Sequence, residues 1–252
     1  MKKQQQFSTE EIVVSVKNLK KAFGEKEVIR GLSFDLKRGE NLVVLGKSGT
    51  GKSVTIKCIV GLIEPDEGEI KVFDQEVVGS SSKQLHEVRK KIGFLFQSGA
   101  LYDSMTVKEN MEFPLKRMDK KISREECNSR IEETLSNVGL LDAMNKYPSE
   151  LSGGMRKRAG LARTLVQRPD IILYDEPTTG LDSITSKEIS DLINELKEKY
   201  KVSSIIITHD MPCAQITSDR IIILSDGKLI AEGTYQQLNN TKDQFVSSFF
   251  HI

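Results

Sequence analysis

The sequence has no tryptophan, only three cysteines and a net charge of +1. It also has no long apolar run. Its longest apolar run, Cys58 to Ile63, has six residues, whereas a membrane-spanning helix needs about 20. Lys and Arg number 37 and Asp and Glu 36, and this balance argues against bulk binding to nucleic acid. A membrane-spanning protein and a strongly basic nucleic-acid-binding protein are therefore not predicted.

The cysteines and the N-terminus indicate a cytoplasmic protein. Cys58, Cys127 and Cys213 are odd in number and form no CxxC pair, which fits a reducing compartment and offers no zinc site. Residues 1–6 are polar, where a signal peptide would need an apolar stretch. With 252 residues and 38% hydrophobic residues, the chain is long enough for one large domain, or a core with a subdomain.

Four unbroken apolar runs predict strands that are buried on both faces of a parallel sheet. A helical pattern over Ser183 to Tyr200 lies between two of them, and this alternation predicts an α/β fold. The first forty residues predict strands as well, because Leu32, Phe34 and Leu36 alternate with polar residues. The four runs are Asn41–Leu45, Ile171–Tyr174, Ile205–Ile207 and Ile221–Leu224.

The middle of the chain differs from its two ends. Residues 98–167 show helical patterns, no buried-strand run, and punctuation by Pro114 and Pro148. We interpret them as a helical subdomain inserted into a core of residues 1–97 and 168–252, within a single domain spanning 1–252.

Two features are expected near the C-terminus. Asp226-Gly227 predicts a hairpin. Residues 243–252 predict a short helix, whose Phe245, Phe249 and Phe250 either cover the core of the same chain or contact a second copy.

Residues 46–53 match the phosphate-loop pattern G-x-x-x-x-G-K-[ST], with a buried strand before them and a predicted helix, Lys52 to Leu62, after them. Glycines let backbone N–H groups face a phosphate, and the helix N-terminus adds positive potential. Lys52 is expected to reach the β- and γ-phosphates and Ser53 to bind Mg²⁺; the alternative is a glycine-rich turn with an incidental lysine. The residues expected to bind nucleotide here are Gly46, Lys47, Ser48, Gly49, Thr50, Gly51, Lys52, Ser53 and Thr55.

Two carboxylates follow a buried run at Asp175 and Glu176. A strand end beside the phosphate loop is where a second Mg²⁺ ligand would lie, which favours Asp175. Glu176 could then orient and deprotonate the attacking water. The alternative is an acidic turn before Pro177.

Leu151-Ser152-Gly153-Gly154-Met155 resembles the signature motif of the ABC-type ATPases, and the full set of that family's motifs is present in order along the chain. Gln97 matches the glutamine of the Q-loop, Asp182 the D-loop and His209 the switch histidine, while Phe23 is similar to the aromatic that stacks on adenine. The resemblance implies a P-loop NTPase (RecA-like) core with an N-terminal antiparallel β region and a helical subdomain. The basic run Arg156-Lys157-Arg158 is interpreted as a solvated helix face, not a nucleic-acid site.

Family membership implies ATP and Mg²⁺ as cofactors and a head-to-tail dimer with a second copy, in which each ATP contacts the signature loop of the other subunit. It implies that Glu176, His209 and Lys52 are catalytic, and that Ser53, Gln97 and Asp175 hold the metal. The remaining nucleotide contacts that it implies are Phe23, Gln97, Ser152, Gly153, Gly154 and Asp182.

Residues 96–107 resemble the Q-loop region of MlaF-type ATPases, which belong to Mla/Mce phospholipid transport systems. This resemblance implies an ATPase subunit that is peripheral to the cytoplasmic face of the inner membrane, with a permease and an Mce-type substrate-binding protein as partners. The permease would dock on an apolar patch at Ser98, Ala100, Leu101, Tyr102 and Met105.

Three other functions are weighed against this one. An ABC transporter for another substrate would share the nucleotide chemistry. A soluble ABC protein of translation or DNA repair usually has two ATPase domains or a long coiled coil, which this sequence lacks. An inactive subunit is disfavoured because Lys52, Asp175, Glu176 and His209 are all present. The direction of transport and the number of other subunits stay open.

Overall fold

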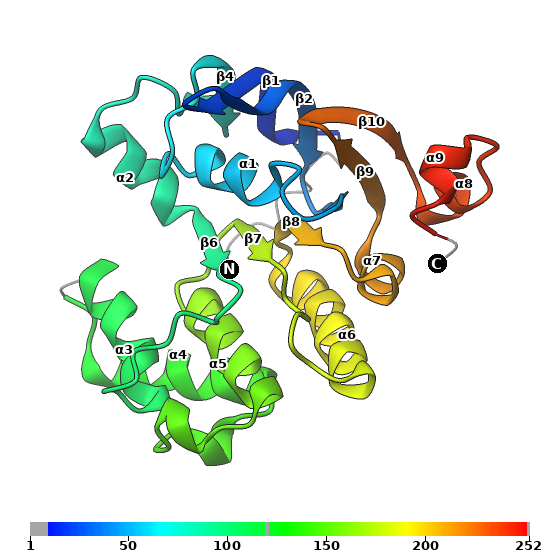
Figure 1. The fold of residues 1–252 in the computed structure, drawn as a ribbon. Coiled ribbons are helices and arrows are strands. Elements are labelled where there is room, and N and C mark those ends of the chain that lie inside the picture. Colours follow the sequence, from blue (N-terminus) through cyan, green and yellow to red (C-terminus); the bar gives the residue numbers. More distant parts are fainter. Residues whose placement is uncertain (1–9, 119–120, 251–252) are drawn as a thin grey trace.

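The computed structural model describes residues 10–118 and 121–250 (Figure 1). The polar segment 1–6 and the last two residues of the predicted C-terminal helix lie outside the described residues. No helix among the described residues combines the length and the apolar character needed to cross a bilayer.

A six-stranded sheet with the order β10-β9-β3-β8-β7-β6 forms the centre of the molecule. All pairings are parallel except that of β10 with β9. Every residue of β3, β7 and β8 is buried, as their unbroken apolar runs predicted. The strands are β3 (Asn41–Leu45), β6 (Ile92–Leu95), β7 (Ile171–Asp175), β8 (Ser203–Thr208), β9 (Arg220–Ser225) and β10 (Lys228–Gly233).

Strand β6 was not predicted. It has four residues and contains Gly93, so it resembles a loop in sequence. A Cβ at Gly93 would lie 2.4 Å from Thr164 Cγ2, so close packing of the helix that carries Thr164 requires glycine at this strand position.

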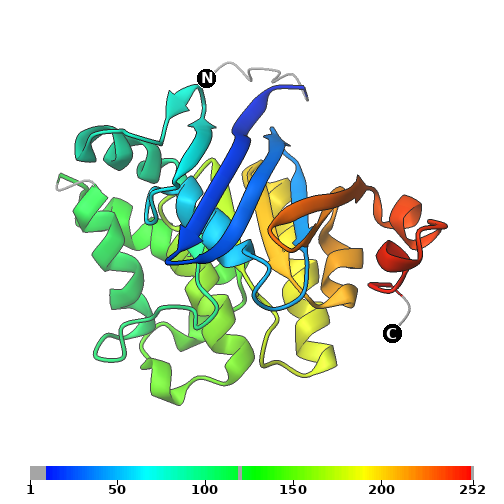
Figure 2. The ribbon, with the colours of Figure 1, turned by 45° about the horizontal axis from the view of Figure 1, so that its top comes forward.

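A second sheet is antiparallel and has the strand order β2-β1-β4-β5. Leu32, Phe34 and Leu36 are buried, as their alternation predicted. Helix α1 (Lys52–Ile59) lies between the two sheets, and its Ile56 and Ile59 belong to one apolar cluster with residues of both (Figure 2). The strands are β1 (Ile12–Phe23), β2 (Lys26–Lys37), β4 (Glu67–Val72) and β5 (Gln75–Glu76).

Helix α1 ends three residues earlier than predicted. Gly61 adopts a left-handed φ of 63°. Its N–H donates to Cys58 O, and the N–H of Leu62 donates to Lys57 O. These two bonds form a Schellman motif, which ends a helix once a glycine takes the left-handed conformation.

Helices fill the stretch between β6 and β7, and none of the described residues there forms a strand. Pro114 lies inside α3 and does not end it, contrary to the prediction; the helix continues although proline removes one backbone donor. Pro148 opens a 3₁₀ turn. The helices of this stretch are α3 (Val107–Met118), α4 (Arg124–Asn137), η1 (Leu141–Ala143), η2 (Pro148–Glu150) and α5 (Gly153–Leu165). Outside it lie α2 (Ser82–Lys90), α6 (Ser183–Tyr200), α7 (Met211–Thr217), α8 (Tyr235–Asn239) and α9 (Gln244–Ser247).

The C-terminal part follows the predicted pattern in outline. Asp226 and Gly227 both have positive φ, 47° and 74°, as the two-residue turn between β9 and β10 requires. Helix α9 is a single turn. Phe249 and Phe250 pack against the main core of the same chain, whereas Phe245 is 49% exposed.

Candidate active site

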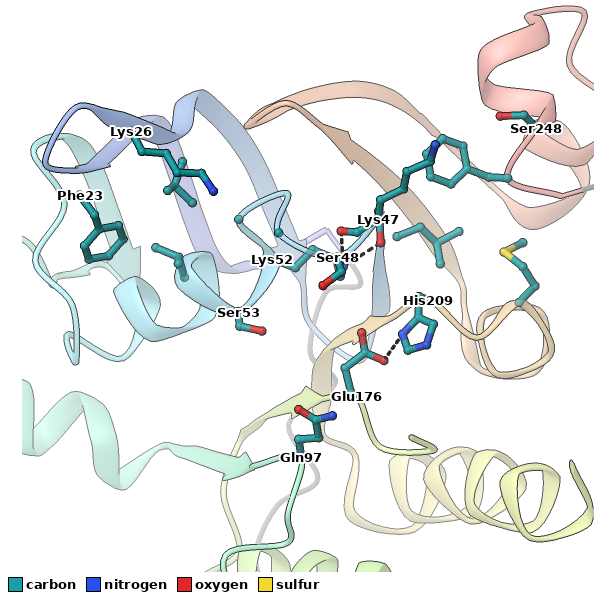
Figure 3. A pocket seen from close by; sticks show the side chains of 18 residues that line it. Phe23, Lys26, Lys47, Ser48, Lys52, Ser53, Gln97, Glu176, His209 and Ser248 are labelled. Carbon is teal, nitrogen blue, oxygen red and sulfur yellow. Dashed lines mark hydrogen bonds and ion pairs between the residues drawn. The ribbon is translucent and has the colours of Figure 1, made fainter. Parts of the chain in front are cut away.

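A cavity of about 800 Å³ opens beside the phosphate loop and the ends of β3 and β7 (Figure 3). It brings together eleven of the predicted site residues from distant parts of the sequence. These are Phe23, Gly46, Lys47, Ser48, Gly49, Gly51, Lys52, Ser53, Gln97, Glu176 and His209. Seven further lining residues were not predicted, namely Lys26, Val28, Leu45, Val54, Met211, Ser248 and Phe249.

Lys52 is 6% exposed at the first position of α1. Its Nζ donates to Gly46 O at 2.7 Å and to Lys47 O at 3.0 Å, so loop carbonyls hold the ammonium group. Burial lowers the pKa of Lys52, while Glu176 and Asp175 act in the opposite direction. A desolvated cation at a helix N-terminus is well placed to bind a phosphate group.

Ser53 and Asp175 meet at the carboxyl end of β7, where Ser53 Oγ donates to Asp175 Oδ1 at 2.9 Å. Asp175 is 8% exposed. Such a pair of hard oxygen ligands suits Mg²⁺, which usually takes one or two protein ligands and completes its shell with phosphate and water. The residues present therefore fit Mg²⁺ bound together with a nucleotide.

Glu176 and His209 form a pair in the cavity, with Glu176 Oε2 2.8 Å from His209 Nδ1 (Figure 3). The same oxygen accepts a hydrogen bond from Thr179 Oγ1 at 3.1 Å. Side-chain exposure is 13% for Glu176 and 64% for His209. A carboxylate so held, with its other oxygen not used by these bonds, can orient and deprotonate a water molecule.

Phe23 lies at the end of β1, 49% exposed, on one wall of the cavity (Figure 3). Lys21 Nζ lies 5.5 Å from the centre of its ring. An exposed aromatic in a cavity beside a phosphate loop can stack on a nucleobase. The structure therefore places Phe23 outside the apolar core.

The signature and D-loop residues do not line the cavity but form a second cluster. Ser152 caps α5 by accepting from the Met155 N–H at 3.3 Å. Asp182 caps α6 and accepts a 2.6 Å hydrogen bond from Thr185 Oγ1, which, with backbone N–H donors, lowers the pKa of Asp182. A Cβ at Gly154 would lie 2.6 Å from Thr185 Cγ2. Close contact of the two helix starts therefore requires glycine in the signature loop.

Gly153 approaches the D-loop less closely, since a Cβ there would lie 3.4 Å from Leu181 Cδ2.

Thr50 and Thr55 differ from the expectation that they line the nucleotide site. Thr50 Oγ1 donates to Lys47 O at 2.9 Å, and neither threonine lines the cavity. Thr55 is 2% exposed and donates to Gly51 O at 3.0 Å, because a threonine inside a helix readily bonds the carbonyl four residues earlier.

The basic run on α5 is not a solvated face as a whole. Arg156 is exposed, but Lys157 is 7% exposed and Arg158 pairs with Glu188 at 3.0 Å. Three consecutive helical residues point in directions about 100° apart, so one of them faces inward. The core-facing spacing of Lys157 with Leu161 could have indicated its burial.

His209→Ala should lower the maximal rate of ATP hydrolysis by about tenfold, or ~1.4 kcal/mol of barrier, while ATP affinity changes little. The reason is that Glu176 keeps its carboxylate and its hydrogen bond from Thr179. It loses only the contact with His209, the residue after β8, which helps to fix the carboxylate. Steady-state hydrolysis and equilibrium ATP binding measure the two effects. An unchanged rate would show that His209 does not act through Glu176.

Comparison with known proteins agrees with this geometry. The family model described as ABC transporter matches residues 29–179. The Haemophilus influenzae intermembrane phospholipid transport system ATP-binding protein MlaF is 38% identical, covering 94% of this chain and 89% of its own. The probable ribonucleotide transport ATP-binding protein mkl of Mycobacterium leprae is also 38% identical, with 95% and 69% coverage.

Among solved structures, the dimeric ATP-binding cassette MJ0796 in a post-hydrolysis state with ADP and Pi is 35% identical. It superimposes with a TM-score of 0.80 and covers 88% of this chain and 98% of its own. This chain therefore has the fold of that cassette, with the phosphate loop after β3, the Asp175–Glu176 pair at the end of β7 and Ser152 at the start of α5. This chain belongs to the ABC transporter family, as an ATP-binding cassette that hydrolyses ATP.

Proposed function

We propose that the chain is the ATPase subunit of a transporter that moves phospholipid between bacterial membranes through a separate permease. The observation that carries the proposal is the Glu176–His209 pair beside Lys52. The phospholipid substrate is supported by the likeness to MlaF over most of both chains and by the MlaF-like segment 96–107. Transport of another substrate is the second candidate, since the mkl relative is named for ribonucleotides.

Each side chain in the cavity has a proposed role toward ATP. Phe23 stacks on the base, and Lys52 leaves its loop carbonyls to bind the β- and γ-phosphates. Ser53 and Asp175, with Gln97, would hold Mg²⁺, which neutralises phosphate charge when bound. Glu176 takes the proton of the attacking water, while His209 and Thr179 fix its carboxylate.

A second copy of the chain would complete the site. Ser152, Gly153, Gly154 and Asp182 lie outside the cavity of their own subunit, yet Ser152 caps the 13-residue helix α5, whose N-terminus favours anions. In a head-to-tail dimer these residues would face the γ-phosphate bound by the partner. The proposal therefore places two ATP molecules between two copies.

The helical stretch 98–167 is proposed as the subdomain that receives the permease at the cytoplasmic face of the inner membrane. Tyr102 is 42% exposed, and its ring contacts Phe113 edge-on at 5.2 Å. Arg163 lies 5.0 Å from the Tyr102 ring and donates to Ala100 O at 2.8 Å. Because buried Asn110 bonds Tyr102 N–H and O, the segment offers a fixed surface to a partner.

Three other residues of the predicted patch, Ala100, Leu101 and Met105, are only partly exposed, and Leu101 packs against the main core. Ser98 is exposed beside them. A charge at Leu101 would therefore disturb folding as well as docking, and Tyr102 is the better position for a test.

Tyr102→Asp should leave a folded, ATP-binding subunit that no longer holds the permease, because the docking face loses an aromatic ring and gains a carboxylate. Burying that carboxylate on docking is costly even with Arg163 nearby, since desolvation can exceed the gain from an ion pair. Co-purification from detergent-solubilised membranes measures docking, and a thermal melt checks the fold. Leu62→Asp is the matched control, since Leu62 is 54% exposed outside the helical stretch. Normal permease recovery with Tyr102→Asp would contradict the proposed surface.

Affinity purification of the tagged chain from native membranes tests the substrate. We expect a polytopic permease and an Mce-type protein in the complex, whose ATP hydrolysis rises with added phospholipid and not with ribonucleotides. A complex that is stimulated by ribonucleotides and insensitive to phospholipid would contradict the proposal in favour of the second candidate.

A further inference from the structure

Helix α5 carries a buried cation that the chemistry above does not use. Lys157 is 7% exposed, and its Nζ donates to two backbone carbonyls on different segments. One acceptor is Gln97 O, two residues after the end of β6, and the other is Glu176 O, at 3.3 Å, directly after β7. One side chain thus joins α5 to Gln97 and Glu176, two of the residues that line the nucleotide cavity.

The charge surroundings of Lys157 include the carboxylates of the site. Burial lowers the pKa of Lys157, while Glu176 and Asp175 favour its charged form. A cation that is costly to bury persists where it has partners. Here its direct partners are the backbone carbonyls of Gln97 and Glu176. These hydrogen bonds therefore fix the main chain and do not occupy the carboxylates of Asp175 and Glu176, which the proposed function assigns to metal and water.

Glu176 needs such fixing because its backbone is strained. Its φ is 54°, in the left-handed region that residues with a side chain rarely adopt. A backbone in this conformation persists only where its surroundings determine it from several sides. The Glu176 N–H donates to Ile207 O at 2.9 Å, and Lys157 holds the carbonyl. Strand β8 and helix α5 therefore hold the residue between them.

Helix α5 also contacts the segment after Gln97 directly. A Cβ at Gly160 would lie 2.9 Å from Gly99 O. Ser152 caps the same helix five residues before Lys157, or about 8 Å along the axis. The helix is thus a short rigid connection from the signature loop to the backbone of Gln97 and Glu176.

We propose that Lys157 is a positioning residue of ATP hydrolysis, which ties the backbones of Gln97 and Glu176 to α5. The Glu176 carboxylate then holds its working position only while α5, which begins in the signature motif, is packed on the sheet. This inference rests on the proposed function, in which Glu176 activates water and the signature loop contacts the nucleotide of a second copy. Lys157 does not line the nucleotide cavity, and its Nζ acts on backbone carbonyls.

Lys157→Met tests the proposal, since methionine has a similar length and lacks the donor. We expect the maximal hydrolysis rate per ATP-binding site to fall at least tenfold, with the ATP dissociation constant within twofold of wild type. Lys157→Arg should restore most of the rate. Arg156→Met, at the exposed neighbouring position, is the matched control and should leave the rate unchanged. Rates per bound ATP exclude any unfolded fraction.

A double variant separates positioning from a structural role. If Lys157 acts through Glu176, adding Lys157→Met to Glu176→Gln should change the residual single-turnover rate less than twofold, because groups that act as a unit are not additive. An equal proportional loss in both backgrounds, or an unchanged rate for Lys157→Met alone, would overturn the proposal. Absence of Lys52-dependent hydrolysis in the wild type would instead overturn the proposed function and this inference together.

Discussion

Glu176→Gln should bind ATP like the wild type and lower its turnover by about 100-fold or more, since general bases contribute roughly that much. Glutamine keeps the shape and can still contact His209 and Thr179, whose atoms lie 2.8 and 3.1 Å from Glu176 Oε2. It cannot accept the proton of water. Because the bridging nucleotide is then not consumed, a dimer with trapped ATP should accumulate, visible by size-exclusion chromatography.

Glu132→Gln provides the control for this experiment, because Glu132 is an exposed glutamate on α4 and its neutralisation should change neither turnover nor dimer formation. A turnover of Glu176→Gln within about twofold of wild type, ~0.4 kcal/mol of barrier, would contradict the general-base role.

Two inactive variants should restore nucleotide trapping when they are mixed. Lys52→Ala removes the phosphate-binding cation, and Ser152→Arg blocks the signature loop. In a head-to-tail dimer of one subunit of each kind, one composite site keeps both Lys52 and Ser152. At equal mixing, roughly a quarter of the wild-type sites should be intact, since half of the dimers are mixed and each has one good site.

Retention of labelled ATP after rapid filtration measures this restoration, with each variant alone as the control. Thermal melts check the folding of Ser152→Arg, because loss of the helix cap costs about 1 kcal/mol. If the mixture retains no more ATP than the two variants do separately, the two motifs do not share a nucleotide across subunits.

The parts of this structure that sequence patterns predicted have local causes. A strand such as β8, buried on both faces, leaves an unbroken apolar run, and helix α6 leaves a stripe with Ile189, Leu192 and Leu196 on one side. The bounds of α6 are as predicted because Asp182 caps its start. The phosphate loop can also be predicted from local sequence, because its glycines and its lysine lie within eight consecutive residues, 46–53.

The features that were not predicted depend on tertiary contacts. Glu176 meets His209 because β7 and β8 are parallel neighbours, with Asp175 beside Ile207, and nothing local indicates their distance. The burial of Lys157 depends on which side of α5 faces the sheet. Ser248 and Phe249 line the cavity because the C-terminal segment, distant in sequence, packs against the core through Phe249 and Phe250.

In the proposed dimer, two copies of this chain share the ATP that they hydrolyse. The most direct measurement is the hydrolysis rate per subunit at saturating Mg-ATP, over about three decades of subunit concentration, because a site built from two subunits depends on their association. With Lys52→Ala as the blank, we expect a rate per subunit that rises with concentration and then reaches a plateau. A rate per subunit that is constant down to the lowest concentration, at which the chain is shown to be monomeric, would contradict it.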